Sequence, residues 1–201
     1  QDFSPFTLFP SLSPVPTELV PTDLADNVPS VSPVSLAPST TIDGVINAVR
    51  RIILRASPET ESALDVPSPQ SEAFEWLLIW IGLGPIDASD EHIIQRFVLA
   101  TLYYSTRGDE WKANTDWLRT RVDECEWLGL VCEDDAPFGQ DFRHVTGIFL
   151  DDLGLQGSIP QEIILLTDLQ TLQFMNNTVS GTIPDNIGLL SQLEFFLADD
   201  N

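Results

Sequence analysis

Apolar residues recur at intervals of three and four in three segments, a spacing that predicts amphipathic helices. The first segment follows Thr41, and its Thr-x-x-Asp start is typical of a helix N-terminus. The second begins at Ser68-Pro69, where Ser suits the N-cap and Pro the first helical position, and it stops at Gly84-Pro85. The third begins near Ser89 and ends at Arg107-Gly108, where Gly is expected to supply the C-terminal turn.

From Val145 onward the hydrophobic pattern repeats every 24 residues, because Leu155–Ile163 matches Val179–Ile187 position for position. Each unit supplies a short strand whose first, fourth and sixth positions are apolar, followed by an Asn that can bond the turn backbone of neighbouring units. We expect Leu172 and Ile183 to point into the interior. The corresponding strand positions are Val145, Ile148 and Leu150, then Leu169, Leu172 and Phe174, then Leu193, Phe196 and Ala198, with Asn177 and Asn201 after the last two.

Two motifs carry a family resemblance. The L-x-G-x-I-P signature at Leu155–Pro160 and Val179–Pro184 resembles the plant-specific class of leucine-rich repeats, and Trp111–Cys132 resembles their disulfide-containing N-terminal cap. Ser68–Trp76, together with Gln95–Tyr104, is most similar to the longer cap of leucine-rich repeat proteins from diatoms and related algae. The resemblance implies an α/β fold, a short leucine-rich repeat solenoid with a helical N-terminal cap.

Four segments are expected along the chain. Residues 1–40 form a Pro/Ser-rich extended arm, 41–108 a helical region, 109–144 the disulfide cap, and 145–201 about two and a half repeats, incomplete at the C-terminus. The first repeat departs from the family pattern in carrying Leu153 where Asn is expected. Apolar residues recur at every third position of the arm, so it is either a linker or a polyproline-type ligand for a groove.

The cap resemblance implies a disulfide between Cys125 and Cys132, the only cysteines of the chain. Two free buried thiols are the alternative, and a metal site lacks further ligands at suitable spacing. A bridge over so short a loop contributes about 2–3 kcal/mol in the chain-entropy model. It also implies secretion or an oxidising organelle lumen, with any targeting peptide removed or outside the given sequence.

Composition narrows the function classes. With 31 acidic against 9 basic residues the net charge is −22, which opposes nucleic acid and anionic membrane surfaces. No run of apolar residues is long enough to span a membrane. The signatures of nucleophilic, phosphate-binding and zinc-dependent catalysis are absent, so we expect neither an enzyme nor a cofactor or metal. Acids cluster at Asp123/Glu124/Glu126 and elsewhere, but nothing in the sequence marks one as desolvated.

The residues between the buried strand positions predict a ligand-binding face. They form columns of exposed apolar groups with an acidic rim, the composition of a protein or peptide site, although solvated acids without a ligand explain the same pattern. Asn176-Asn177-Thr178 is a sequon that makes Asn176 a candidate glycosylation site. The predicted binding residues are Phe149, Asp151, Asp152, Gln170, Gln173, Met175, Glu194, Phe195 and Leu197.

Two functional hypotheses follow. The first is a non-catalytic module that recognises a protein, peptide or other ligand through the concave repeat face. The alternative is an accessory subunit that docks into a larger assembly through its N-terminal arm and an uncapped solenoid end. Both fit an extracellular or lumenal protein.

Overall fold

Three α-helices begin where the sequence predicts. The computed structural model describes residues 41–83, 88–133 and 142–201. In it α1 spans Ile42–Ala56, α2 Pro69–Leu83 and α3 Asp90–Ser105. The predicted stop of α2 at Gly84-Pro85 and the predicted N-terminal arm lie outside the described residues.

Side-chain caps fix these helix starts. The Thr41 hydroxyl accepts a hydrogen bond from the Gly44 N–H, the Ser68 hydroxyl from the Ser71 N–H and the Ser89 hydroxyl from the His92 N–H. Each cap satisfies a backbone donor that has no partner within its helix. The predicted starts are therefore confirmed, and the reason is local in the sequence.

The predicted role of Gly108 at the end of α3 is wrong. The left-handed residue is Arg107, with φ of 55°, whereas Gly108 begins the short 3₁₀-helix η2, Gly108–Glu110. A Cβ atom at Gly108 would lie 2.1 Å from the ring of Tyr103. Glycine is required there because the chain passes close to an aromatic ring, and not for its turn geometry.

The repeat forms a sheet of four strands. In spatial order these are β1 (Leu130–Cys132), β2 (Val145–Phe149), β4 (Thr171–Gln173) and β6 (Phe195–Leu197). The last three are parallel and pair in register at the 24-residue spacing of the sequence repeat, whereas β1 adds to β2 in the antiparallel direction. The sequence pattern did not predict β1.

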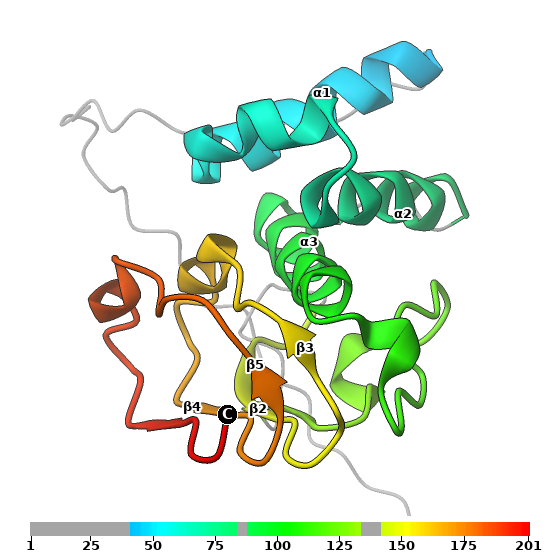
Figure 1. Cartoon of the computed structure of the whole chain (residues 1–201). Helices are drawn as coiled ribbons and strands as arrows, with labels where there is room; N and C mark the ends of the chain where they lie inside the picture. Colours follow the sequence, from blue (N-terminus) through cyan, green and yellow to red (C-terminus); the bar gives the residue numbers. More distant parts are fainter. Residues whose placement is uncertain (1–40, 84–87, 134–141) are drawn as a thin grey trace, which may run out of the picture. The chain divides into compact units, whose positions relative to one another are not determined.

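Helix α3 packs beside the repeats, and short strands and 3₁₀-helices make up the remaining elements. Figure 1 shows α3 between α2 and the strands, and α3 packs on the 3₁₀-helix η4. All described residues fall in one compact unit, residues 33–201. The remaining elements are β3 (Gln156–Gly157), which pairs with β5 (Thr178–Val179), and the 3₁₀-helices η1 (Pro58–Asp65), η3 (Glu124–Glu126), η4 (Gln161–Leu165) and η5 (Ile187–Leu189).

The predicted inward positions are buried in the first two units. Leu172 is almost fully buried, as are its counterpart Ile148 and the other apolar strand positions from Val145 to Phe174. The third unit is only partly covered. Ile183 points toward the interior as predicted, but its side chain stays 56% exposed. It lines a pocket at the end of the stack that no described residue covers.

An asparagine ladder joins successive units. The buried Asn177 side chain donates to the carbonyls of Leu150, Phe174 and Met175 and accepts from the N–H groups of Gly154 and Leu155. Three of these five partners belong to the preceding unit. Asn201 repeats the pattern one unit later, accepting from Val179.

The ladder explains the departure at Leu153, the first-unit counterpart of Asn177. Among the described residues no repeat unit precedes this position, so none of them offers the turn groups that an Asn would bond. The cap provides a contact instead, because the Lys112 N–H donates to the Leu153 carbonyl at 2.8 Å. An apolar side chain at this position, packed against the core, is therefore sufficient.

The predicted disulfide between Cys125 and Cys132 is present. It links η3 to β1. Beside it, Glu124 is only 2% exposed, so this acid is desolvated, which the sequence did not indicate. Its carboxylate accepts from Gln95 Nε2 and Arg96 Nε, both at 2.8 Å, and His92 Nε2 lies 3.0 Å from Oε1.

The Arg96 side chain completes this cluster. Its guanidinium lies over the rings of Trp80 and Trp127, with Cζ 4.6 and 5.4 Å from the ring centroids, and donates to the Val122 carbonyl at 2.6 Å. Gln95 accepts from the Val145 N–H at 3.0 Å. The cluster thus fixes α3 to the disulfide loop and to the first residue of β2.

Burial alone would raise the pKa of Glu124, but the contact with His92, the charges of His92 and Arg96 and the Gln95 hydrogen bond lower it from 4.5 to about 2. A lowered pKa means that the stabilisation is fully present above pH 4.5 and is lost as the pH falls toward 2.

This pKa predicts a pH-dependent difference between the native protein and Glu124→Gln. At pH 7 the native protein is more stable, and between pH 4.5 and pH 2 the difference should shrink by about 3 kcal/mol as Glu124 is protonated. Urea unfolding of both proteins across this range measures it. A constant difference would show that the charge of Glu124 does not contribute.

Candidate functional site: the outward face of the repeat sheet

The side of the sheet that faces solvent, which we call the sheet face, carries the residues between the buried strand positions. Strand pairing places Val131, Gly147, Thr171 and Phe195 in one row across the four strands. Phe149, Gln173 and Leu197 form the next row. The predicted columns are therefore brought together, with Val131 as an additional member.

Apolar side chains are exposed on this face. Val131 is 48% exposed, Phe149 40% and Phe195 54%. A Cβ atom at Gly147 would lie 2.6 Å from Phe149 Cε2 and 3.3 Å from Val131 Cβ, so the Phe149 ring lies over the glycine and beside Val131. Because Gly147 has no side chain, the Phe149 ring can pack directly against the sheet at this position.

The sequence pattern did not predict Val131 as part of the binding face, because it did not predict strand β1. Its signal was present in Leu130-Val131-Cys132, where an exposed apolar residue alternates between less exposed neighbours. Alternation over three residues is too short to predict a strand.

Two of the predicted acidic residues are engaged within the chain. The Asp151 carboxylate accepts hydrogen bonds from the Gln173 side chain and from the Met175 N–H, so it ties the first unit to the second. Asp152 forms an ion pair with Lys112 of the cap. These two acids position the face, and they offer less free charge to a ligand than the sequence suggested.

Glu194, the third predicted acid, and two acids near it are available to a ligand. Glu194, Asp199 and Asp200 are exposed, and no ion pair to them is found among the described residues. They surround Phe195 and the half-buried Leu197 from both ends of β6. Gln170 is exposed just before β4, and its carbonyl accepts from the Glu194 and Phe195 N–H groups.

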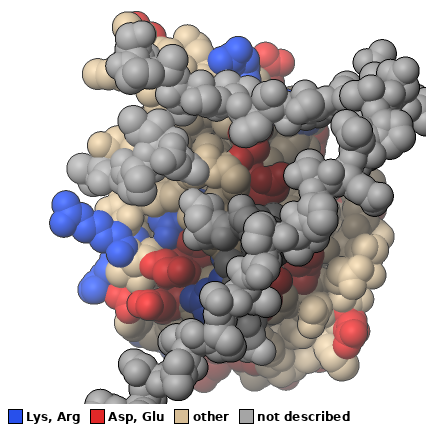
Figure 2. All heavy atoms as spheres, turned by 180° about the vertical axis from the view of Figure 1, so that it is seen from behind, with Lys and Arg blue, Asp and Glu red and all other residues tan. Residues whose placement is uncertain are grey.

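Charge is not confined to one cluster. On the face drawn in Figure 2, acidic side chains lie in several separate places, with basic side chains beside some of them. Acidic and basic side chains also pair elsewhere in the described chain, as in Arg50–Asp65 and Arg143–Asp123. Acidic side chains are therefore spread over this face and are not gathered into a single acidic site.

A turn of constant geometry follows each strand. Asp152, Asn176 and Asp200 occupy equivalent positions and have left-handed φ values of 53°, 54° and 57°. The short polar side chains of Asp and Asn tolerate this conformation better than other residues with a Cβ atom. Asn176 is exposed at the rim where the strands end, whereas Asn177 beside it is buried in the ladder.

No family model matches the chain. Individual plant proteins are nevertheless similar to it in sequence. It is 34% identical over 87 residues to the receptor-like kinase TMK4 of Arabidopsis thaliana, covering 43% of this chain and 8% of that protein. A probable LRR receptor-like serine/threonine-protein kinase of the same plant, At5g65240, is 34% identical over 72 residues, covering 35% of this chain and 11% of that protein. These similarities support a leucine-rich repeat protein.

The leucine-rich repeat chain thus matches only about a tenth of the length of these relatives. Among solved structures it is similar to the LRR ectodomain of the receptor kinase SOBIR1 from Arabidopsis thaliana. That likeness has a TM-score of 0.34 and 29% sequence identity, and covers 39% of this chain and 42% of the other.

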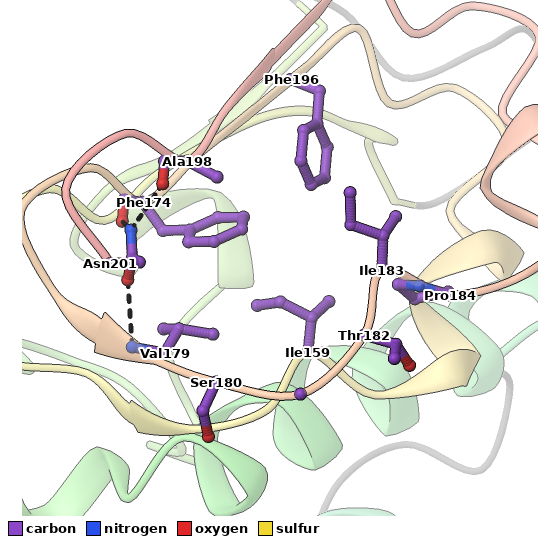
Figure 3. Close-up of a pocket in the computed structure, with 11 residues that line it drawn as sticks. Ile159, Phe174, Val179, Ser180, Thr182, Ile183, Pro184, Phe196, Ala198 and Asn201 are labelled. Atoms are coloured by element: carbon purple, nitrogen blue, oxygen red, sulfur yellow. Dashed lines mark hydrogen bonds between the residues drawn. The ribbon is translucent and has the colours of Figure 1, made fainter.

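A second surface lies at the end of the stacked repeats. Figure 3 shows Ile159, Phe174, Ile183 and Phe196 pointing toward a common pocket, with Asn201 at its edge. The lining residues carry no charge, although the chain as a whole is strongly acidic. This pocket is the part of the repeat interior that no described residue covers.

Other site types find little support in the part of the chain that the structure describes. No group of His, Cys, Asp and Glu there is arranged to hold a metal, and no helix there is long and apolar enough to cross a membrane. Burial and the hydrogen bond with Asp109 raise the pKa of Tyr103. Its hydroxyl therefore stays protonated and donates to Asp109 of η2.

Proposed function

We propose that this chain is a protein-recognition module of the plant-type leucine-rich repeat class, and that its sheet face binds a protein or peptide ligand. The observation that carries the proposal is that Val131, Phe149 and Phe195 are exposed apolar side chains in two adjacent rows of the same face. Large apolar groups that are exposed together, with a polar rim, are typical of sites where another protein binds.

The chemistry of the face supports a non-catalytic role. Its side chains are apolar groups, amides and carboxylates. One carboxylate, Asp151, links the first two repeat units, and another, Asp152, links the first unit to the cap. Among the residues described on this face we find no nucleophile beside a general base, which covalent catalysis requires. The disulfide supports a location outside the cell or in an oxidising lumen, and the relatives named as receptor kinases fit that location.

Alanine substitution of the two exposed aromatic residues tests the proposal. Peptides that bind the immobilised full chain are first selected from a random displayed library, and their affinities are then measured for variants. Phe149→Ala and Phe195→Ala should each weaken binding about tenfold, and the double variant about a hundredfold, because buried aromatic anchors dominate such interfaces. Circular dichroism checks that each variant is folded.

Ile79→Ala is the matched control, because Ile79 is an equally exposed apolar residue on α2, away from the sheet. It should leave the affinities unchanged. Selected peptides that bind the double variant as tightly as the native chain would show that the sheet face is not the site.

The uncharged pocket at the end of the repeats favours a second candidate, an accessory subunit that docks through this end. Ile183→Lys distinguishes the two. Under the subunit hypothesis it should prevent assembly into the larger complex, because a charge would be buried at the contact. Binding of peptides to the sheet face should be unaffected.

A further inference from the structure

We propose that Asn176 carries an N-linked glycan, and that this glycan closes one rim of the sheet face. The sequon Asn176-Asn177-Thr178 supplies the acceptor, and the structure supplies its accessibility. The modification itself rests on passage of the chain through an oxidising secretory compartment. Its effect on ligand approach rests on the function proposed above.

The side chain of Asn176 is free to be modified. It is exposed, and no hydrogen bond from it is found among the described residues. Its backbone is fixed, because its N–H donates to the Asp199 carbonyl at 3.0 Å and its φ is 54°. A substituent on the amide would therefore extend from an ordered turn into solvent without disturbing the ladder formed by Asn177.

The equivalent turns show that this position tolerates a polar group that points away from the fold. They carry Asp152 and Asp200, with φ values within a few degrees of that of Asn176. Of these three positions the middle one is Asn, and Thr178 follows it two residues later to complete the sequon. The acceptor thus stands between two carboxylates at the same rim.

The transfer is a substitution at the anomeric carbon of a lipid-linked oligosaccharide diphosphate, catalysed by a transferase of the host compartment. The Asn176 amide nitrogen forms the new bond to the anomeric carbon, the bond from that carbon to the diphosphate oxygen breaks, and the amide loses one proton. The Thr178 hydroxyl donates to the Leu155 carbonyl in the folded chain. The transfer therefore belongs to the stage before the repeat units stack, when the Thr178 hydroxyl is free as well.

A glycan at this place restricts the approach of a ligand. Asn176 follows β4 at the carboxyl ends of the parallel strands, near Met175 and the Lys112–Asp152 ion pair. The amino ends of the strands, where Gln170, Glu194 and Phe195 lie, remain open. A ligand should therefore reach the exposed apolar groups from the amino-end rim.

Secretion of the full chain from a eukaryotic host, behind a signal peptide, tests the modification. The intact mass should exceed the sequence mass by a glycan, and enzymatic deglycosylation should leave Asp at position 176. Thr178→Ser should keep the glycan, because Ser also completes a sequon. Asn176→Asp should lack it and fold normally, because Asp occupies the same turn in the neighbouring units.

Two outcomes separate this inference from the proposed function. Secreted protein with a closed Cys125–Cys132 disulfide and an unmodified Asn176 would overturn the glycosylation, whatever the sheet face binds. If the glycan is present, the selected peptides should bind the glycosylated and deglycosylated chains equally well. A loss of affinity of tenfold or more on glycosylation would overturn the proposed direction of approach and leave the modification standing.

Discussion

Replacing Glu124 by Ala should destabilise the protein by about 3–5 kcal/mol, the largest effect expected for any single charged residue described here. The carboxylate is buried and holds Gln95, Arg96 and His92 together. Its removal leaves the Arg96 guanidinium, itself nearly inaccessible to water, without its counter-charge. Since the same contacts connect α3, the disulfide loop and β2, the loss should affect the whole unit in a single unfolding transition.

Glu126→Ala is the matched control, because Glu126 lies two residues away on the same short helix and is exposed. Chemical denaturation should show a change of no more than about 0.5 kcal/mol for it. Combining Glu124→Ala with Arg96→Met should recover part of the loss, because the unpaired charge is then removed. If Glu124→Ala and Glu126→Ala behave alike, the buried ion pair contributes nothing measurable to the fold.

This cluster could not be predicted from the sequence, and the reason is distance along the chain. Arg96 and Glu124 are separated by 28 positions, and the acidic stretch around Glu124 has the composition of a solvated loop. Nothing local distinguishes Glu124 from Glu126. The distinction arises only when η3 places one carboxylate toward α3 and its neighbour toward solvent.

The helices and the repeat were predictable because their signals are local or periodic. A cap such as Thr41 acts within three residues of the helix it begins, and a 24-residue repeat specifies the register of parallel strands directly. Strand β1 was not predictable, because it is three residues long and pairs with β2 in the opposite direction across a bulge. Only tertiary packing decides its existence.

The candidate site was predictable in position but not in chemistry. Alternation along the strands correctly placed Phe149, Gln173 and Leu197 in one row. It gave no indication that the Asp151 carboxylate would accept a hydrogen bond from Gln173 of the next unit. Such a bond depends on the rotamers of both side chains. The exposure of Ile183 has a related reason: its side chain points inward as the motif predicts, but burial requires another layer over it.

Replacing Asn177 by Ala should destabilise the protein by about 3 kcal/mol. The side chain satisfies three buried carbonyls and two N–H groups, and Ala satisfies none of them. Leaving buried backbone groups without partners costs about 1–3 kcal/mol each when water cannot reach them. Partial access of water at the turn, whose neighbour Asn176 is exposed, keeps the total well below the sum.

The ladder itself provides the comparison for this result. Asn201 forms the corresponding bonds at the exposed end, so Asn201→Ala should cost less than about 1 kcal/mol, because water replaces the lost partners. Asn176→Asp in unglycosylated protein should be neutral, which controls for a change at the same turn. Equal losses at positions 177 and 201 in chemical denaturation would mean that burial of the ladder is not what makes Asn177 important. A large loss at 177 alone would show that the contact between the first two units is the one on which the stability of the repeat depends.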